Sequence, residues 1–153
     1  MADSLLASLG LPAATFVIAF IAGMFPLVSI ELFLVGAAAL GVPPPVLAIL
    51  IVIAVVGHQI AKTITYYAGA GVFELPRGRL RARIEAAQQR IDRWNRRPRL
   101  VMFAGAAFGL PPLLLLGFIA RPVMRMELTT FTALSATGRI LRYTTLVAIA
   151  ALV

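Results

Sequence analysis

The residue best suited to chemistry in this sequence is one carboxylate inside a long apolar run. Glu31 lies within Phe20–Leu40 (FIAGMFPLVSIELFLVGAAAL), which Pro26 also interrupts. A charged side chain at membrane depth costs roughly 2.5–3.5 kcal/mol on insertion scales, and non-helical backbone survives there only where protein buries it or water reaches it. We therefore predict a broken helix around a polar cavity, with Glu31 facing a basic group. The alternative is a carboxyl held by the neighbouring Ser29 hydroxyl or wetted at an interface.

Two arginines in the last apolar segment are the candidate partners of this carboxylate. Arg139 and Arg142 lie three residues apart within Glu127–Val153, so a helix places them on one face. Charges inside a membrane span need partners, and Glu31 is the only acid in the first apolar stretch. We predict a contact from Glu31 to Arg139 or to Arg142. A guanidinium that stays partly open would bind a phosphate through two parallel hydrogen bonds; the alternative is that both arginines extend to an interface.

A second pair of basic side chains lies in the segment that most clearly predicts a spanning helix, Val46–Tyr67. His58 and Lys62 are four residues apart there and share a helix face. Two cations together would attract an anion or lower each other's proton affinity. A structural role is the alternative for the histidine. The pair does not resemble a metal site, because metal sites need more ligands.

No enzyme active site is recognisable in the sequence. The chain lacks G-x-S-x-G, H-E-x-x-H and glycine-rich phosphate-binding patterns. Ser29 and Ser135 lie in apolar context, and nothing singles out a base for either. The absence of cysteine excludes disulfides, thiolate metal sites and cysteine nucleophiles. We therefore expect no enzymatic activity, no metal and no cofactor.

Composition predicts that the elements holding these residues lie in a membrane. Of the 153 residues, 61% are hydrophobic and 13% are charged, whereas soluble domains are about 25% charged. The mean hydropathy is +0.96. We expect an all-α integral membrane protein with a single domain, residues 1–153.

Positive charge is concentrated in one block. The formal net charge is +8, from 14 basic and 6 acidic residues, and nine of the arginines lie between Arg77 and Arg99. The block lacks the interleaved aromatic residues that stack on bases, so we expect no nucleic-acid partner. We interpret it as the cytoplasmic face of an inner-membrane protein, against anionic lipid headgroups.

Apolar residues recur every three or four positions within this block. Leu80, Ile84 and Ile91 fall on one stripe, which predicts a basic amphipathic helix over 76–99 lying in the interface plane. The alternative is a solvated linker helix packed on the core. The expected membrane-surface residues are Arg79, Arg83, Arg90, Arg93, Trp94 and Arg97.

Two segments resemble each other at an offset of about 85 residues. AFIAGMFPLVSIELFLVGAAALGVP and MFAGAAFGLPPLLLLGFIARPVMRM each contain an apolar piece, a proline break and a second apolar piece, and a long helix follows each. Inverted repeats with broken helices are typical of transporters. The expected hairpin turns are at Pro26, Pro111 and Pro112. We divide the domain into a first repeat (1–75), the basic helix (76–99) and a second repeat (100–153).

Charge favours one of two topologies. If every apolar segment crosses the membrane, Arg121 and Arg125 lie outside, which the positive-inside rule disfavours. If segments 13–40 and 100–120 are re-entrant, these arginines join the cytoplasmic block. We favour the second topology, with two spanning helices and two re-entrant hairpins related by a pseudo-two-fold axis.

Three segments together resemble the DedA / VTT-domain superfamily, also called the SNARE-associated Golgi protein family. FPLVSIELFLVGAAALG resembles its first re-entrant motif, in which a proline precedes a short turn, a glutamate and an apolar run. GHQIAKTITYYAGA resembles its G-x-x-x-G-D-x-x-x-Y-Y-x-G-R segment, and GLPPLLLLGFIARPVMRMELTTFTALSATGRILRY resembles its second motif with the closing helix. The resemblance covers about Phe20–Tyr143, and the small YqaA-like branch is nearest.

A few positions depart from the family pattern. Lys62 replaces an aspartate found in many members, and Ala70 replaces the arginine that closes the tyrosine motif. The arginine that follows the second proline turn in R-F-x-P-x-x-R-T has no match in Leu113–Leu116. These departures argue against a proton-driven mechanism.

The resemblance implies a lipid translocase or scramblase that moves an anionic lipid, a polyprenyl phosphate or a phospholipid, between leaflets. The headgroup would pass between the hairpins along a path lined by Glu31, His58, Lys62, Arg139 and Arg142. Two other functions fit the sequence: a secondary transporter of a small ion or metabolite, and a membrane scaffold or assembly factor that docks partners through 76–99. The chain is short for a two-hairpin transporter, which is compatible with a homodimer.

Overall fold

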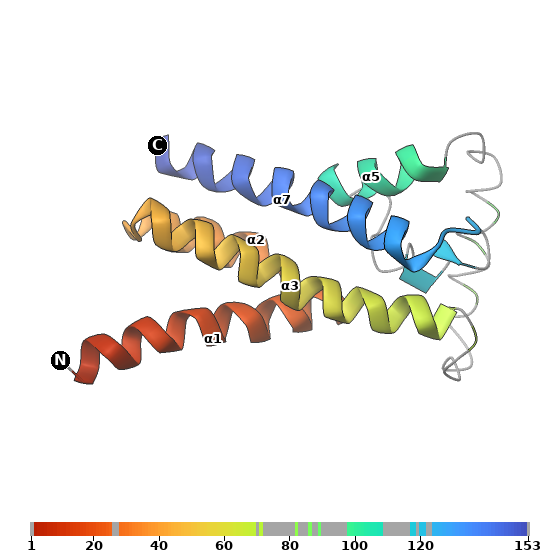
Figure 1. Ribbon diagram of the computed structural model, residues 1–153. Helices are drawn as coiled ribbons and strands as arrows, with labels where there is room; N and C mark the ends of the chain where they lie inside the picture. Colours follow the sequence, from red (N-terminus) through yellow and green to blue (C-terminus); the bar gives the residue numbers. More distant parts are fainter. Residues whose placement is uncertain are drawn as a thin grey trace. The chain divides into compact units, whose positions relative to one another are not determined.

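The chain is helical almost wherever its structure is described. A computed structural model describes residues 2–25, 28–69, 71, 82, 86, 89, 98–108, 117–118, 120–121 and 124–152. The helices are α1 (Ala2–Met24), α2 (Ile30–Ala39), α3 (Pro44–Gly69), α5 (Pro98–Phe108) and α7 (Leu128–Leu152), and these described residues include no strand (Figure 1). The predicted all-α class is confirmed for this part of the chain.

Two compact units divide the chain. Unit 1 comprises Met1–Ala61 with Ile140–Val153, and unit 2 comprises Lys62–Arg139. Some predicted residues lie outside the described part: Pro26, Pro111, Pro112, Arg79, Arg83, Arg90, Arg93, Trp94 and Arg97. Their roles stay predictions, as does the division of the chain into repeats and a basic helix.

The observed bounds of the two longest helices agree well with those predicted from the sequence. α3 has 26 residues and contains the predicted span Val46–Tyr67. Among the described residues, it is the helix that is long and apolar enough to cross a membrane, since a crossing takes about 20 residues. α7 agrees with the predicted Glu127–Val153 to within one residue at each end.

The first helix is longer than the sequence predicts. Gly10 and Pro12 are helix breakers, so the sequence predicts a lead-in ending there and a short apolar piece over Ala13–Phe25. Instead, α1 continues through both residues for 23 residues. A proline removes one backbone hydrogen bond, and this loss does not outweigh the helical bonds that continue on both sides. The predicted break at residues 10–12 is therefore wrong.

The predicted break inside Phe20–Leu40 is present, because α1 and α2 are separate helices. Ser29 caps α2: its Oγ accepts a hydrogen bond from the backbone N–H of Leu32 at 3.3 Å. The buried residues of α2 fall on one helical face and are Ile30, Leu34 and Ala37. The break thus places Glu31 in the first turn of a short, capped helix.

Within unit 1, α1 and α3 approach closely because glycines lie at their contact. A Cβ atom on Gly57 of α3 would lie 2.8 Å from the carbonyl oxygen of Phe16 on α1. A Cβ atom on Gly23 of α1 would lie 2.5 Å from the Cβ atom of Ala61. Small residues let helix backbones approach in this way, as is common between membrane helices.

Unit 2 has a core of aromatic and methionine side chains. Its buried members are Tyr66, Met102, Phe118, Ala120, Met124, Met126 and Phe131. The Tyr66 hydroxyl donates a hydrogen bond to the Met126 carbonyl at 2.8 Å, and the Tyr66 ring lies 5.2 Å from that of Phe131. A Cβ atom on Gly138 would lie 2.6 Å from the Cβ atom of Ala106, so α5 and α7 also pack closely.

Gly57→Ala is expected to destabilise the protein, because the added methyl group would meet backbone rather than a movable side chain. Overpacking costs about 1–3 kcal/mol, and each kcal/mol lowers the melting temperature by about 2–4 °C at this chain length. The measurement is thermal unfolding of the purified protein in detergent. Gly36→Ala in α2 is the matched control, because nothing lies within 4 Å of its Cβ position. Equal destabilisation by both substitutions would contradict the close contact of α1 and α3.

Candidate functional site

Glu31 forms an ion pair with Arg142 inside unit 1. Glu31 Oε1 lies 3.1 Å from Arg142 Nη2, and the side chains are 21% and 26% exposed, respectively. The Ser29 hydroxyl donates a hydrogen bond to Glu31 Oε2 at 2.9 Å. The positive end of the α2 dipole further favours a carboxylate in this first turn. The predicted contact is therefore confirmed for Arg142, and the Ser29 contact, predicted as an alternative, is present at the same time.

Arg139, the other predicted partner, lies in unit 2 and is only 1% exposed. Its Nη1 donates a hydrogen bond to the Ser135 hydroxyl one helical turn earlier. Its Nε and Nη2 atoms are buried and make no hydrogen bond. Ser135, which the sequence analysis examined only as a nucleophile, instead orients this guanidinium. Its spacing of four residues before Arg139 would have indicated the contact.

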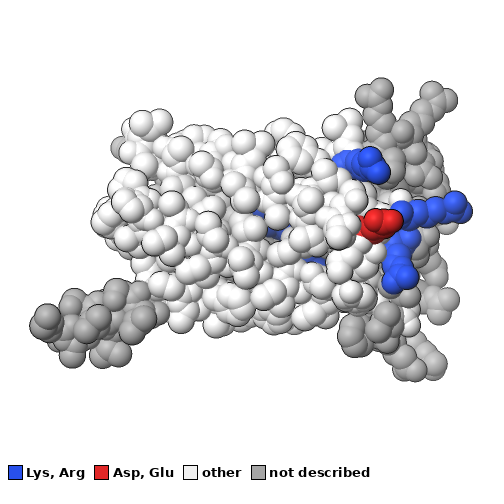
Figure 2. All heavy atoms as spheres, viewed as in Figure 1, with Lys and Arg blue, Asp and Glu red and all other residues white. Residues whose placement is uncertain are grey.

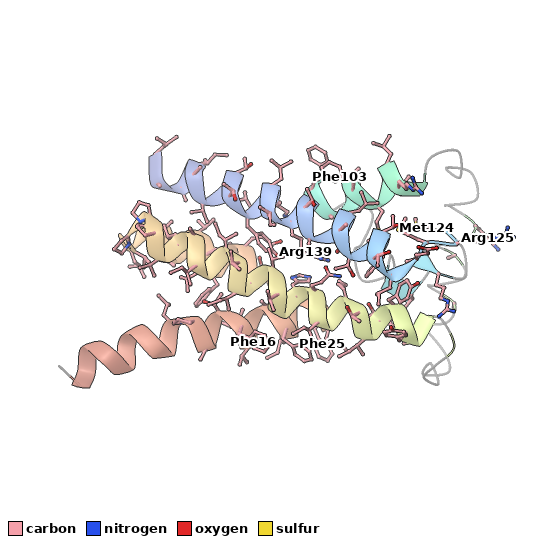
Figure 3. All side chains as sticks on the ribbon, in the orientation of Figure 1. Phe16, Phe25, Phe103, Met124, Arg125 and Arg139 are labelled. Atoms are coloured by element: carbon pink, nitrogen blue, oxygen red, sulfur yellow. The ribbon has the colours of Figure 1, made fainter. Side chains whose placement is uncertain are left out.

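Lys62 is also buried in unit 2, where it is 2% exposed. Figure 3 shows the Arg139 side chain on the inner side of α7. Burying a charge is costly, and burying two like charges together is more costly still. Of the carboxylates whose side chains are described, Glu31 pairs with Arg142, and Glu127 is exposed at the start of α7.

His58 forms a separate contact with α7 within unit 1. Its Nδ1 lies 3.0 Å from the Tyr143 hydroxyl oxygen, and the two side chains are 7% and 1% exposed. A Cβ atom on Gly23 would lie 3.2 Å from His58 Cδ2, so α1 closes over the ring. The structure buries both His58 and Lys62, but His58 belongs to unit 1 and Lys62 to unit 2. Tyr143 was not predicted as a site residue, although it lies one turn after Arg139 on the same helix face.

Comparison of the chain with protein-family models, with curated proteins and with solved structures finds no match.

Glu31→Gln and Arg142→Gln are each expected to lower the free energy of unfolding, and the double variant is expected to lose less than the sum. Half-buried groups in contact couple by about 0.5–3 kcal/mol in such a cycle. The measurement is thermal unfolding of the wild type, both single variants and the double variant. A parallel cycle of Glu31→Gln with Thr144→Val, an exposed position on α7, should be additive. Additive losses for Glu31 and Arg142 would argue that the ion pair contributes no stability.

Tyr143→Phe is expected to change the environment of His58 Nδ1, because it removes the hydroxyl that lies 3.0 Å away. His58 is the one histidine of the chain, so histidine labelled with ¹⁵N gives a single pair of ring signals in NMR. The Nδ1 signal should shift, and the free energy of unfolding should fall by about 1–3 kcal/mol. Tyr67→Phe serves as the control, because Tyr67 packs on Tyr66. An unchanged Nδ1 signal in Tyr143→Phe would exclude the hydrogen bond.

Proposed function

We propose that this protein is a DedA/VTT-like membrane lipid translocase or scramblase that moves an anionic lipid, a polyprenyl phosphate or a phospholipid, between leaflets. The observation that carries the proposal is the burial of Lys62 and Arg139 together in unit 2. A phosphate headgroup would neutralise both cations, and a guanidinium matches two phosphate oxygens at once. The Ser135 hydroxyl would hold the guanidinium in a fixed orientation for this contact.

The distribution of polarity on α3 supports a membrane location. Large apolar side chains are exposed at every third or fourth position of this helix, namely Val46, Ile49, Val52, Val56, Ile60 and Ile64. The polar residues His58 and Lys62 are buried instead. A helix of a water-soluble protein exposes its polar face, so this pattern is expected where lipid replaces water. We propose that the protein is multi-pass in the inner membrane, with 76–99 on the cytoplasmic side.

The helix boundaries support two structural repeats. α7 begins at Leu128, 84 residues after the start of α3 at Pro44. This spacing agrees with the offset of about 85 residues between the two sequence segments. We propose that each repeat is a broken hairpin followed by a long helix, an arrangement that allows a site to open toward either leaflet.

The remaining path residues would act differently from the buried cations. In unit 1, Glu31 and Arg142 neutralise each other, and His58 lies against Tyr143. We therefore propose that Glu31, Arg142 and His58 line the path, whereas Lys62 and Arg139 bind the headgroup. The acyl chains would stay in the bilayer throughout.

In proteoliposomes with a fluorescent phospholipid or a polyprenyl phosphate, the wild type is expected to move lipid between leaflets. Arg139→Gln should slow this movement about tenfold, which corresponds to about 1.4 kcal/mol of lost headgroup binding. Lys62→Met should also slow it, yet keep or raise the melting temperature, because one of two buried charges is removed. Thr144→Val, at an exposed position of α7, is the control with unchanged transport.

Three outcomes would count against this proposal. If the folded wild type moves no lipid but the vesicles take up a small anion, a secondary transporter is favoured. If the protein moves neither lipid nor a small anion, and charge reversal in 76–99 abolishes function in cells, a scaffold is favoured. If Lys62→Met loses stability and transport in parallel, the buried lysine is structural and does not bind the headgroup.

A further inference from the structure

One residue of unit 2 holds a backbone conformation that its own side chain disfavours. Arg125 has a φ of +49°, in the left-handed region that favours glycine. No other non-glycine residue in the described part of the chain has a positive φ. Residues in this region persist where the surrounding structure fixes them, and they are frequent at functional sites. The side chain of Arg125 is exposed, so it contributes little packing that would offset the strain.

The residues on either side of Arg125 fix this conformation. Met124 and Met126 are 6% and 5% exposed and belong to the core of unit 2. The Met126 N–H donates a hydrogen bond to the Ala120 carbonyl at 2.9 Å, and the Met126 carbonyl accepts one from the Tyr66 hydroxyl at 2.8 Å. With both neighbours anchored inward, the residue between them turns outward. Figure 3 shows Arg125 extending away from the ribbon.

The exposed basic residues in the described part of the chain all belong to unit 2. They are Arg99, Arg121 and Arg125. Glu127 is the one exposed acid beside them. Figure 2 shows blue Lys and Arg atoms and red acidic atoms near one another at the end of unit 2 where α5 and α7 begin. The other described basic side chains, those of Lys62, Arg139 and Arg142, are buried or half-buried.

We propose that Arg125, supported by Arg99 and Arg121, forms a fixed binding surface for the phosphate headgroups of anionic lipids in the adjacent leaflet. This surface lies outside the proposed translocation site and does not depend on transport. A guanidinium binds a lipid phosphate through two hydrogen bonds, and the anionic leaflet attracts basic groups at its surface. Anchoring the backbone of Arg125 in advance lowers the conformational entropy lost on binding. The retained strain is explained if the arginine side chain is needed for this contact.

The test compares lipid binding with stability in the full-length protein. The purified protein in neutral detergent is titrated with short-chain phosphatidylglycerol, and bound lipid is counted by native mass spectrometry. Separate titrations with phosphatidylcholine and with inorganic phosphate serve as comparisons. We expect the wild type to bind phosphatidylglycerol at least about fivefold more tightly than either comparator, because an exposed basic group contributes about that factor at an anionic surface. The difference should shrink as salt is added, since exposed charges are screened.

Two substitutions separate charge from strain at position 125. Arg125→Gly should lower phosphatidylglycerol affinity about fivefold and raise the melting temperature, because glycine adopts this φ freely. Arg125→Gln keeps the strain without the charge, so it should lower affinity with no gain in stability. Glu127→Gln, which removes the neighbouring acid, should raise affinity.

The proposal is overturned if both Arg125 variants bind phosphatidylglycerol as the wild type does. It is also overturned if inorganic phosphate binds as tightly as phosphatidylglycerol, which would identify a site for a free anion. A lower melting temperature of Arg125→Gly with unchanged affinity would assign the arginine a structural role. This assay measures binding in detergent, where there is no bilayer to cross. A negative result here is therefore distinguishable from a loss of lipid transport through Lys62 and Arg139.

Discussion

Lys62 and Arg139 are both buried in a unit whose helices expose apolar side chains. Taking charge-bearing side chains out of water in this way is costly, because hydration no longer stabilises them. The surrounding structure must therefore hold both charges in place. Ser135 orients the guanidinium, and the close contact of Gly138 with Ala106 fixes the α7 backbone just before it. This burial is the reason why we propose that unit 2 binds an anionic headgroup.

In unit 1, a second arginine of α7, Arg142, is paired with a carboxylate, that of Glu31. Arg142 lies three residues after Arg139 on α7, yet Glu31 neutralises it at 3.1 Å. Glu31 is in place because Ser29 both caps α2 and bonds the carboxylate. Two arginines close in sequence thus have different electrostatic environments. The difference is the physical reason why we propose headgroup binding for Arg139 and a path-lining role for Arg142.

Several features could be predicted from particular residues. The apolar run after Pro45 predicts α3, and the interruption near Pro26 predicts separate helices α1 and α2. The lone acid in the first stretch predicts an arginine partner, which the Glu31–Arg142 pair confirms. The break at Gly10 and Pro12 was wrongly predicted, because local breakers are weak against a helix that continues on both sides. Tyr143 and Ser135 were missed as partners, since hydroxyl groups in apolar helices give little sequence pattern.

The sequence by itself determined the helical class, the positions of the long helices and the residues that could bear charge in an apolar setting. These features follow from the periodicity and composition of neighbouring residues, so they can be predicted from the order of residues along the chain. The tertiary structure alone decided which arginine Glu31 meets, that Lys62 is buried in the same unit as Arg139, and that Arg125 turns outward between two buried methionines. These outcomes depend on packing between residues far apart in sequence, which no local sequence pattern encodes.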